Sequence, residues 1–120
     1  MQRFQDLKVW QRSHALVLAV YRLTATFPVE ERFGLVGQLR RAALSVPTNI
    51  AEGSKGQSGH EYGRFLNIAE GSLAEAEYLL IVSRDLTFAT AGIIQPLLEE
   101  IAELARMLHA LRIKVTGTSK

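Results

Sequence analysis

The sequence predicts an all-α protein built as an antiparallel, up-down-up-down four-helix bundle. Apolar residues recur at spacings of three and four along four long segments, which is the helical period. Short connections join these segments, so successive helices are expected to run antiparallel. No alternating strand pattern competes with them. At 120 residues the chain suffices for one hydrophobic core but not for two, so residues 1–120 are expected to form a single domain.

The first helix is expected at about residues 7–26, with Asp6 as its N-cap. Phe27-Pro28 should end it, because proline pushes the preceding residue out of helical geometry. The helix carries two overlapping apolar stripes, which predicts burial on more than one side. In so small a bundle, the second side is expected to contact another subunit. The stripes consist of Leu7, Trp10, Val17 and Tyr21, and of Val9, Leu16, Val20 and Leu23.

The second helix is expected at about residues 30–54, as the central helix of the bundle. Glu30 and Glu31 suit a helix N-terminus, where acidic side chains are stabilising. Pro47 lies inside the helix and removes one backbone hydrogen bond, which predicts a kink. An apolar face runs beside a stripe of small and polar residues, so neighbours should contact this helix from several sides. The apolar face comprises Leu35, Leu39, Ala42, Ala43, Val46 and Ile50.

The third helix is expected at about residues 59–87 and the fourth at about 93–115, followed by a frayed tail at 116–120. Ser58 and Glu61 have the spacing of a capping box, and Pro96 suits the first turn of the fourth helix. Each helix has one predicted buried seam. The seam of the third helix is Phe65, Ile68, Ser72, Glu75, Leu79, Val82 and Leu86, and that of the fourth is Ile94, Leu97, Ile101, Leu104, Leu108, Leu111 and Val115.

Antiparallel pairing about Gly56 brings polar residues of the second and third helices together. It places Gln38 near Glu75, Arg41 near Ser72, and Asn49 near Arg64. One interpretation is a buried carboxylate site. The other, which we favour, is a hydrogen-bonded polar layer that fixes helix register. The predicted layer consists of Gln38, Arg41, Ser45, Asn49, Glu52, Ser72 and Glu75.

Catalytic and metal-binding signatures are missing from the sequence. A di-iron bundle needs Glu-x-x-His motifs, but no glutamate has a histidine three residues later. There is no phosphate-binding loop and no nucleophile elbow. We therefore expect no enzyme activity, no catalytic residues, no cofactor and no metal. The absence of cysteine, of a signal region and of a long apolar run predicts a cytoplasmic protein without a membrane segment.

Five glycines lie within or at the ends of the predicted helices, although glycine weakens a helix. Approach of a nucleic-acid backbone is one explanation. Close contact between helices, inside or between subunits, is the one we favour. These glycines are Gly34, Gly37, Gly53, Gly63 and Gly71.

The charges are distributed unevenly along the predicted bundle, although the net charge is only +2. One end collects basic residues and the other collects acidic ones. We therefore hypothesise that the basic end binds the phosphates of RNA or single-stranded DNA. The alternatives are a solvated charge pattern, end-to-end contact between subunits, or a protein partner at the acidic end. The basic residues are Arg3, Lys8, Arg12, Lys55, Arg64, Arg112, Lys114 and Lys120.

The motifs resemble one known family over nearly the whole chain: the four-helix-bundle proteins named for intervening sequences of bacterial 23S ribosomal RNA. Asn-Ile-Ala-Glu-Gly and Gly-Ser-x-x-Glu are the most specific matches. The matching segments are Phe4-x-Asp6-Leu7-x-Val9-Trp10, Phe27-Pro28-x-Glu30, Gly34-Leu35-x-x-Gln38-Leu39-Arg40-Arg41-Ala42-Ala43, Ser45-Val46-Pro47-x-Asn49-Ile50-Ala51-Glu52-Gly53 and Phe65-Leu66-x-Ile68-Ala69-x-Gly71-Ser72-x-x-Glu75.

The resemblance implies a helical bundle that assembles as a ring-shaped homopentamer without enzymatic activity. The chain is also similar to the accessory proteins of diversity-generating retroelements, which bind a reverse transcriptase and nucleic acid. Those proteins are more basic than this chain. We expect an oligomer that binds RNA or single-stranded DNA through its basic end. The alternative is a protein-binding scaffold or adaptor ring with no nucleic-acid role.

Overall fold

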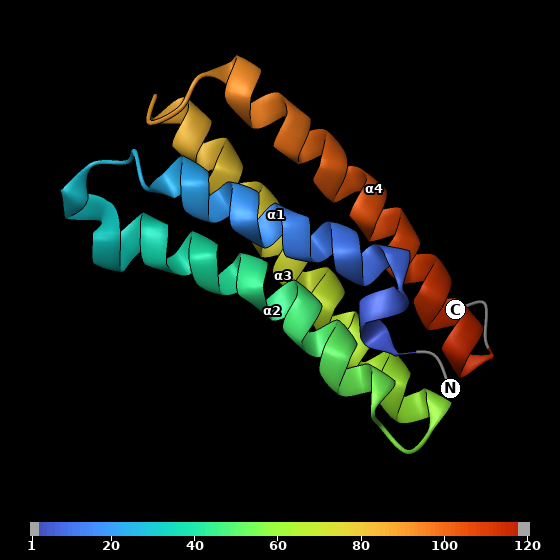
Figure 1. The fold of residues 1–120 in the computed structure, drawn as a ribbon. Coiled ribbons are helices and arrows are strands. Elements are labelled where there is room, and N and C mark those ends of the chain that lie inside the picture. The colour runs from blue at the N-terminus through green and yellow to red at the C-terminus, as the bar shows by residue number, and fades with distance from the viewer. Residues whose placement is uncertain (1–2, 118–120) are drawn as a thin grey trace.

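The computed structural model describes residues 3–117 and contains four antiparallel α-helices (Figure 1). They are α1 (Lys8–Thr24), α2 (Gly37–Ser54), α3 (Gly59–Asp85) and α4 (Ala91–Thr116). Two short 3-10 helices, η1 (Phe4–Asp6) and η2 (Val29–Glu31), and a π-helical segment, η3 (Arg32–Val36), precede α1 and α2. The predicted all-α antiparallel bundle is confirmed. Within residues 3–117, no helix is long and apolar enough to cross a membrane.

Helix α1 begins at Lys8, and the prediction that Asp6 caps it is wrong. Asp6 ends η1, while Leu7 occupies the N-cap position without a capping side chain. The Asp6 carboxylate instead lies 3.5 Å from the guanidinium of Arg3. The two predicted stripes partly merge into one buried face, because Val17 is buried together with Val9, Leu16 and Val20.

Helix α2 begins later than predicted because the backbone is irregular at Gly34, where φ is −101° and ψ is −108°. The segment predicted as the first turns of one helix is therefore divided into η2 and η3. Pro47 is buried inside α2, which continues through it without interruption. The face predicted to be apolar is largely buried, with Leu39, Ala43, Val46 and Ile50 inaccessible to solvent.

The seam predicted for α4 is confirmed at its centre, but the seam predicted for α3 is largely wrong. Ile94, Ile101, Leu104 and Leu108 of α4 are buried. In α3 only Leu79 of the predicted seam is buried, and Ile68, Glu75 and Leu86 are exposed. The buried face of α3 instead combines leucines with small residues, and the small residues leave room for a neighbouring helix to approach, as at Gly63. The buried residues of α3 are Gly63, Leu66, Ala69, Leu73, Ala76, Leu79, Leu80 and Ser83.

The start of α3 is capped by a side chain, and α4 ends at a glycine. Ser58 Oγ accepts a hydrogen bond from the Glu61 amide (3.1 Å), which confirms the predicted cap at Ser58. Glu61 Oε1 accepts a hydrogen bond from the Gln57 amide (3.0 Å) rather than from the Ser58 amide, so the second bond of the predicted capping box is displaced by one residue. Thr116 is helical and Gly117 ends α4 in the left-handed region (φ 69°), so the frayed tail does not begin at residue 116. Residues 118–120 lie outside the described part of the chain.

Glycines allow the start of α3 and the end of α4 to meet closely. A Cβ atom on Gly59 would overlap the backbone carbonyl oxygen of Val115, and one on Gly63 would overlap the Thr116 methyl group. Gly53 similarly packs on Tyr62 and Phe65. Helix contact thus explains Gly53 and Gly63. Nothing lies within 4 Å of a Cβ on Gly71, and Gly34 and Gly37 meet only their own segment.

We predict that Gly59→Ala destabilises the protein by about 1–3 kcal/mol, because the added methyl group must displace backbone rather than a flexible side chain. Gly71→Ala is the matched control on the same helix, where the methyl group meets open space. It should stabilise the protein by about 0.5–1 kcal/mol through helix propensity. Urea unfolding of both variants measures the difference. Equal stability of the two variants would show that the close α3–α4 contact is wrong.

Candidate nucleic-acid interface

Figure 1 shows η1, the α2–α3 turn and the last turns of α4 at the same end of the bundle, and the described basic residues belong to these segments, flank them, or lie in the first two turns of α1 and α3. They fall into two groups. Five side chains are exposed, two arginines are half-buried, and Lys120 lies outside the described residues. The exposed residues are Arg3, Lys8, Lys55, Arg64 and Lys114, and the half-buried ones are Arg12 and Arg112.

Arg12 joins α1 to α4 through an ion pair with Glu100. Its Nη2 and Nε atoms donate to the two carboxylate oxygens at 2.6 and 2.9 Å. The hydrogen bonds that Arg12 donates to this carboxylate, together with the negative charge of Glu100, raise the pKa of Arg12 above the ordinary arginine value. Arg12 therefore stays charged, but Glu100 neutralises it locally. It is a positioning residue between helices rather than a free cation.

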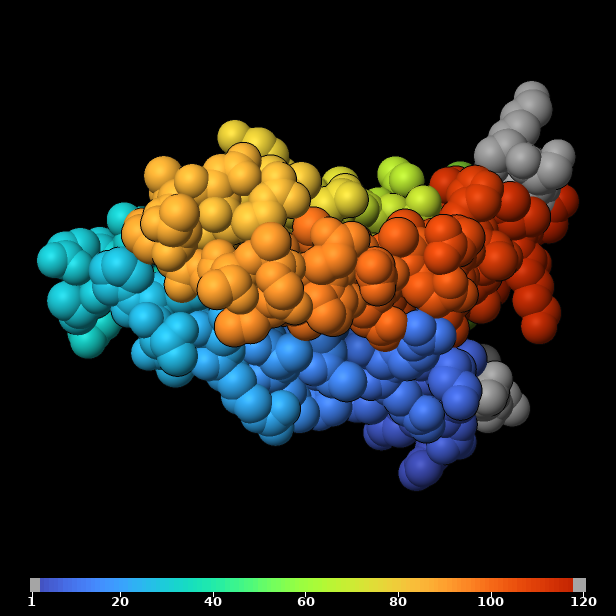
Figure 2. Space-filling view, turned by 90° about the horizontal axis from the view of Figure 1, so that it is seen from above, coloured from blue at the N-terminus to red at the C-terminus, as the bar shows by residue number. Residues whose placement is uncertain are grey.

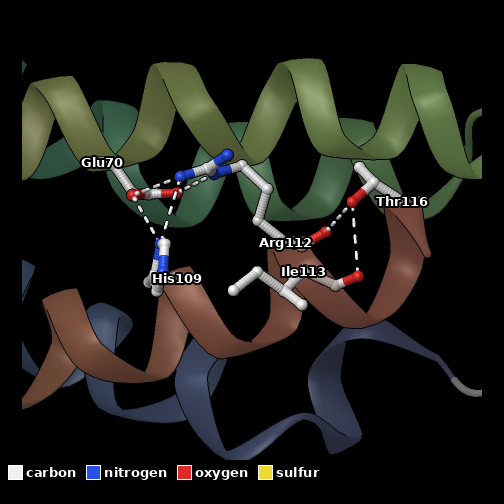
Figure 3. Close-up of polar contacts among 5 residues, drawn as sticks. All are labelled: Glu70, His109, Arg112, Ile113 and Thr116. Atoms are coloured by element: carbon white, nitrogen blue, oxygen red, sulfur yellow. Dashed lines mark hydrogen bonds and ion pairs between the residues drawn. The ribbon is translucent and has the colours of Figure 1, made fainter. Parts of the chain in front are cut away.

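Arg112 joins α4 to α3 in the same way (Figure 3). Its Nε donates to Glu70 Oε2 at 2.5 Å, and its Nη2 to Oε1 at 3.3 Å. His109 completes the group, with Nδ1 3.2 Å from Arg112 Nη2 and 4.0 Å from Glu70 Oε1. The hydrogen bond to Glu70 raises the pKa of Arg112. This second predicted phosphate ligand is also occupied within the chain.

Aromatic side chains accompany several of the exposed cations. The Lys55 ammonium lies 5.8 Å from the centre of the Phe4 ring, and the Arg64 guanidinium lies 4.6 Å from that of Phe65. Phe4 packs edge-on against Trp10, with ring centres 5.1 Å apart, and the exposed His14 ring stacks on Trp10, with ring centres 5.2 Å apart. Partners within the chain thus already engage the rings of this cluster.

The predicted polar layer is smaller than expected and lies one turn away from the predicted pairing. Asn49 Nδ2 donates to the Ser45 carbonyl (2.8 Å) and to Ser45 Oγ (2.9 Å), and Ser72 Oγ donates to Ser45 Oγ (2.7 Å). Ser72 therefore meets Ser45 rather than Arg41, and the contact of Gly53 with Phe65 belongs to the same offset pairing of the two helices. Gln38, Arg41, Glu52 and Glu75 are exposed, so the structure contains neither the full layer nor the alternative buried carboxylate site.

A cavity of about 500 Å³ lies at the basic end, and the sequence analysis did not identify it. It exists because α1 has 17 residues and α4 has 26. The Arg12–Glu100 pair sets the level of α1, and α4 continues about three turns beyond the start of α1. The lining residues are Leu7, Ser54, Gly56, Gln57, Ser58, Gly59, Tyr62, Leu111, Lys114 and Val115. In the sequence, the difference in length between the first and fourth helices was the one sign of this cavity. Predicted helix ends are too uncertain for such a difference to be used.

Comparison with known proteins yields a family and a structural neighbour. The family model described as "23S rRNA-intervening sequence protein" matches residues 5–110. A similar solved structure is a crystal structure from Bacteroides thetaiotaomicron, described as a protein of unknown function from the S23 ribosomal protein family. The TM-score is 0.78 at 21% identity, over 87% of this chain and 97% of the other. This likeness supports the fold. No curated protein matches the chain.

We predict that Arg112→Gln lowers the melting temperature by a few degrees, whereas Lys114→Gln leaves it almost unchanged. Both changes remove one positive charge from the end of α4. Only Arg112→Gln removes the ion-pair partner of a half-buried carboxylate, that of Glu70. Thermal unfolding followed by circular dichroism measures the difference. Equal melting temperatures would contradict the structural role assigned to Arg112.

Proposed function

This chain belongs to the 23S rRNA-intervening sequence protein family, and we propose that it is a non-enzymatic oligomer that binds RNA or single-stranded DNA through its basic end. The observation that carries the proposal is the group of exposed cations at one end of the bundle: Arg3, Lys8, Lys55, Arg64 and Lys114. Phosphate binding by such residues is independent of sequence and sensitive to salt.

The local acids leave most of these cations available. Among residues 3–117, Arg3 is the one exposed cation of this group in an ion pair, a long contact with Asp6. The Glu61 carboxylate is directed to the Gln57 amide instead. Because Arg12 and Arg112 form ion pairs with Glu100 and Glu70, the proposed phosphate-binding surface contains fewer cations than the sequence analysis predicted.

We also propose that copies of the chain associate through the long faces of the bundle, in the ring-shaped homopentamer that the family resemblance implies. Apolar side chains on these faces support association: Leu18 of α1 is 40% exposed and Ile68 of α3 is 42% exposed. Leu44 and Tyr78 are exposed as well.

A protein-binding scaffold is the second candidate function, and exposed apolar residues at the opposite end favour it. The segment containing η2 and η3 projects beyond the bundle there (cyan in Figure 2). In this segment Phe33 is 88% exposed and Val29 is 69% exposed. Leu86 at the end of α3 and Ile93 at the start of α4 are also exposed. A protein partner at this end would cover apolar surface that a monomer leaves in water.

We predict that the unaltered protein has a solution mass near five times the 13.3 kDa of one chain. Ile68→Glu or Leu18→Glu should reduce it to that of smaller species, because a charge would be buried at the interface. Ala102→Glu, at an exposed position of α4, is the control. Light scattering coupled to size exclusion gives the masses. A monomeric unaltered protein would overturn the proposed assembly.

We predict that affinity for single-stranded DNA and RNA falls steeply with salt. The slope of log affinity against log salt should be about −0.7 for each phosphate neutralised on a single strand. Replacing Lys8, Lys55 and Lys114 together with glutamine should weaken binding and reduce this slope. Fluorescence anisotropy over a salt series measures both quantities.

The matched control replaces Arg22, Arg32 and Arg41 with glutamine, which changes the net charge equally at exposed positions away from the basic end. If the control variant weakens binding as much as the lysine variant, net charge rather than the basic end governs binding. If the unaltered protein does not bind at low salt, the nucleic-acid proposal fails and the scaffold function is favoured.

A further inference from the structure

The cavity at the basic end combines two kinds of wall. Leu7, Leu111 and Val115 contribute apolar surface and pack against the core from outside. Gln57, Ser58 and the glycines of the α2–α3 turn form the polar side. A volume of about 500 Å³ lies within the range of small-molecule binding sites. Such a mixture suits a flat ligand with apolar faces and a hydrogen-bonding edge.

Tyr62 gives this cavity an aromatic ring. The ring packs against Gly53 of α2, which holds it in place, and burial raises the pKa of the phenol above its ordinary value. The phenol is therefore neutral at physiological pH and can donate or accept a hydrogen bond. Unlike Trp10 and Phe65, Tyr62 has no stacked aromatic or cationic partner among residues 3–117.

Three lysines lie among the lining residues of the cavity or next to them in sequence. Lys114 is itself a lining residue, Lys8 follows the lining residue Leu7, and Lys55 stands between Ser54 and Gly56. Within residues 3–117, none of the three lysines has an ion pair. A ligand whose apolar ring is attached to negative groups on both sides fits this arrangement better than a neutral molecule or an apolar peptide.

We propose that this cavity holds one unstacked base of a single-stranded nucleic acid, while the bordering lysines contact the phosphates on either side of it. The proposal rests on the nucleic-acid binding proposed above and assigns it a site. Stacking of bases on aromatic side chains is tolerant of sequence, so binding through this cavity needs no particular base.

The test compares a short oligothymidylate with an abasic deoxyribose-phosphate chain of the same length, by anisotropy at low salt. We expect the abasic chain to bind roughly tenfold more weakly, in line with the contribution of one stacked base. Leu111→Ser should weaken binding of oligothymidylate by roughly tenfold and leave binding of the abasic chain unchanged. Leu98→Ser removes the same apolar group from another half-buried position of α4 and should change neither affinity.

A second measurement uses the unaltered protein, so it does not depend on how the variants fold. Oligothymidylate containing a photoreactive thiothymidine should crosslink to the segments that line the cavity, residues 54–62 and 111–115. Crosslinks elsewhere, together with equal affinity for the abasic chain and for oligothymidylate, would overturn the base site. Binding that still weakened with salt would in that case uphold the proposed function. Equal affinity for thymidine monophosphate and oligothymidylate would also overturn it, because the lysines would then contact no neighbouring phosphate. Failure of every probe to bind at low salt would overturn both proposals.

Discussion

The contact between the start of α3 and the end of α4 is the constraint on which the basic end depends. Gly59 and Gly63 present no side chain to Val115 and Thr116, so two helices meet almost backbone to backbone. Helix α1 is too short to follow α4 to that point, and its pair with Glu100 fixes how far it reaches. Space therefore remains beside the last turns of α4, and η1 fills only part of it. The cavity and the exposed lysines around it follow from this difference in length.

Interhelical ion pairs determine which cations of the basic end remain available to a ligand. The sequence places Arg12 and Arg112 on the same end as Lys8 and Lys114, and nothing local distinguishes the two pairs. The distinction arises because Glu100 and Glu70 lie on neighbouring helices, at the level of the arginines. Such a pairing depends on how far one helix is offset along its neighbour. The periodicity of apolar residues indicates which face of a helix is buried, but it does not give this offset. The placement of charges in the sequence therefore predicted that one end of the bundle is rich in basic residues. It overestimated how many of these residues are free of an ion pair within the chain.

The fold could be predicted where one face of a helix is distinctly apolar, and less well where apolar residues surround it. The heptad of α4 places Ile94, Ile101, Leu104 and Leu108 on one face, and these residues are buried. Helix α3 carries large apolar residues on several sides, so Ile68 was assigned to a core that Ala69 and Ala76 occupy. The predicted pairing of α2 with α3 was counted from the Gly56 turn, and counting residues from a turn does not fix how far one helix is offset along the other. The contact of Gly53 with Tyr62 and Phe65 and the hydrogen bond between Ser45 and Ser72 both belong to the observed offset.

The three surfaces proposed for binding do not overlap on one chain. The cavity and its lysines occupy one end, Phe33 and Val29 project at the other, and Leu18 and Ile68 lie on the long faces between them. Association through the long faces would leave every basic end exposed, and a cyclic assembly would place these ends on the same side. Each chain would then add its lysines to one continuous rim. A net charge of only +2 per chain is therefore compatible with binding to a polyanion, because the relevant quantity is the local charge of the assembled rim.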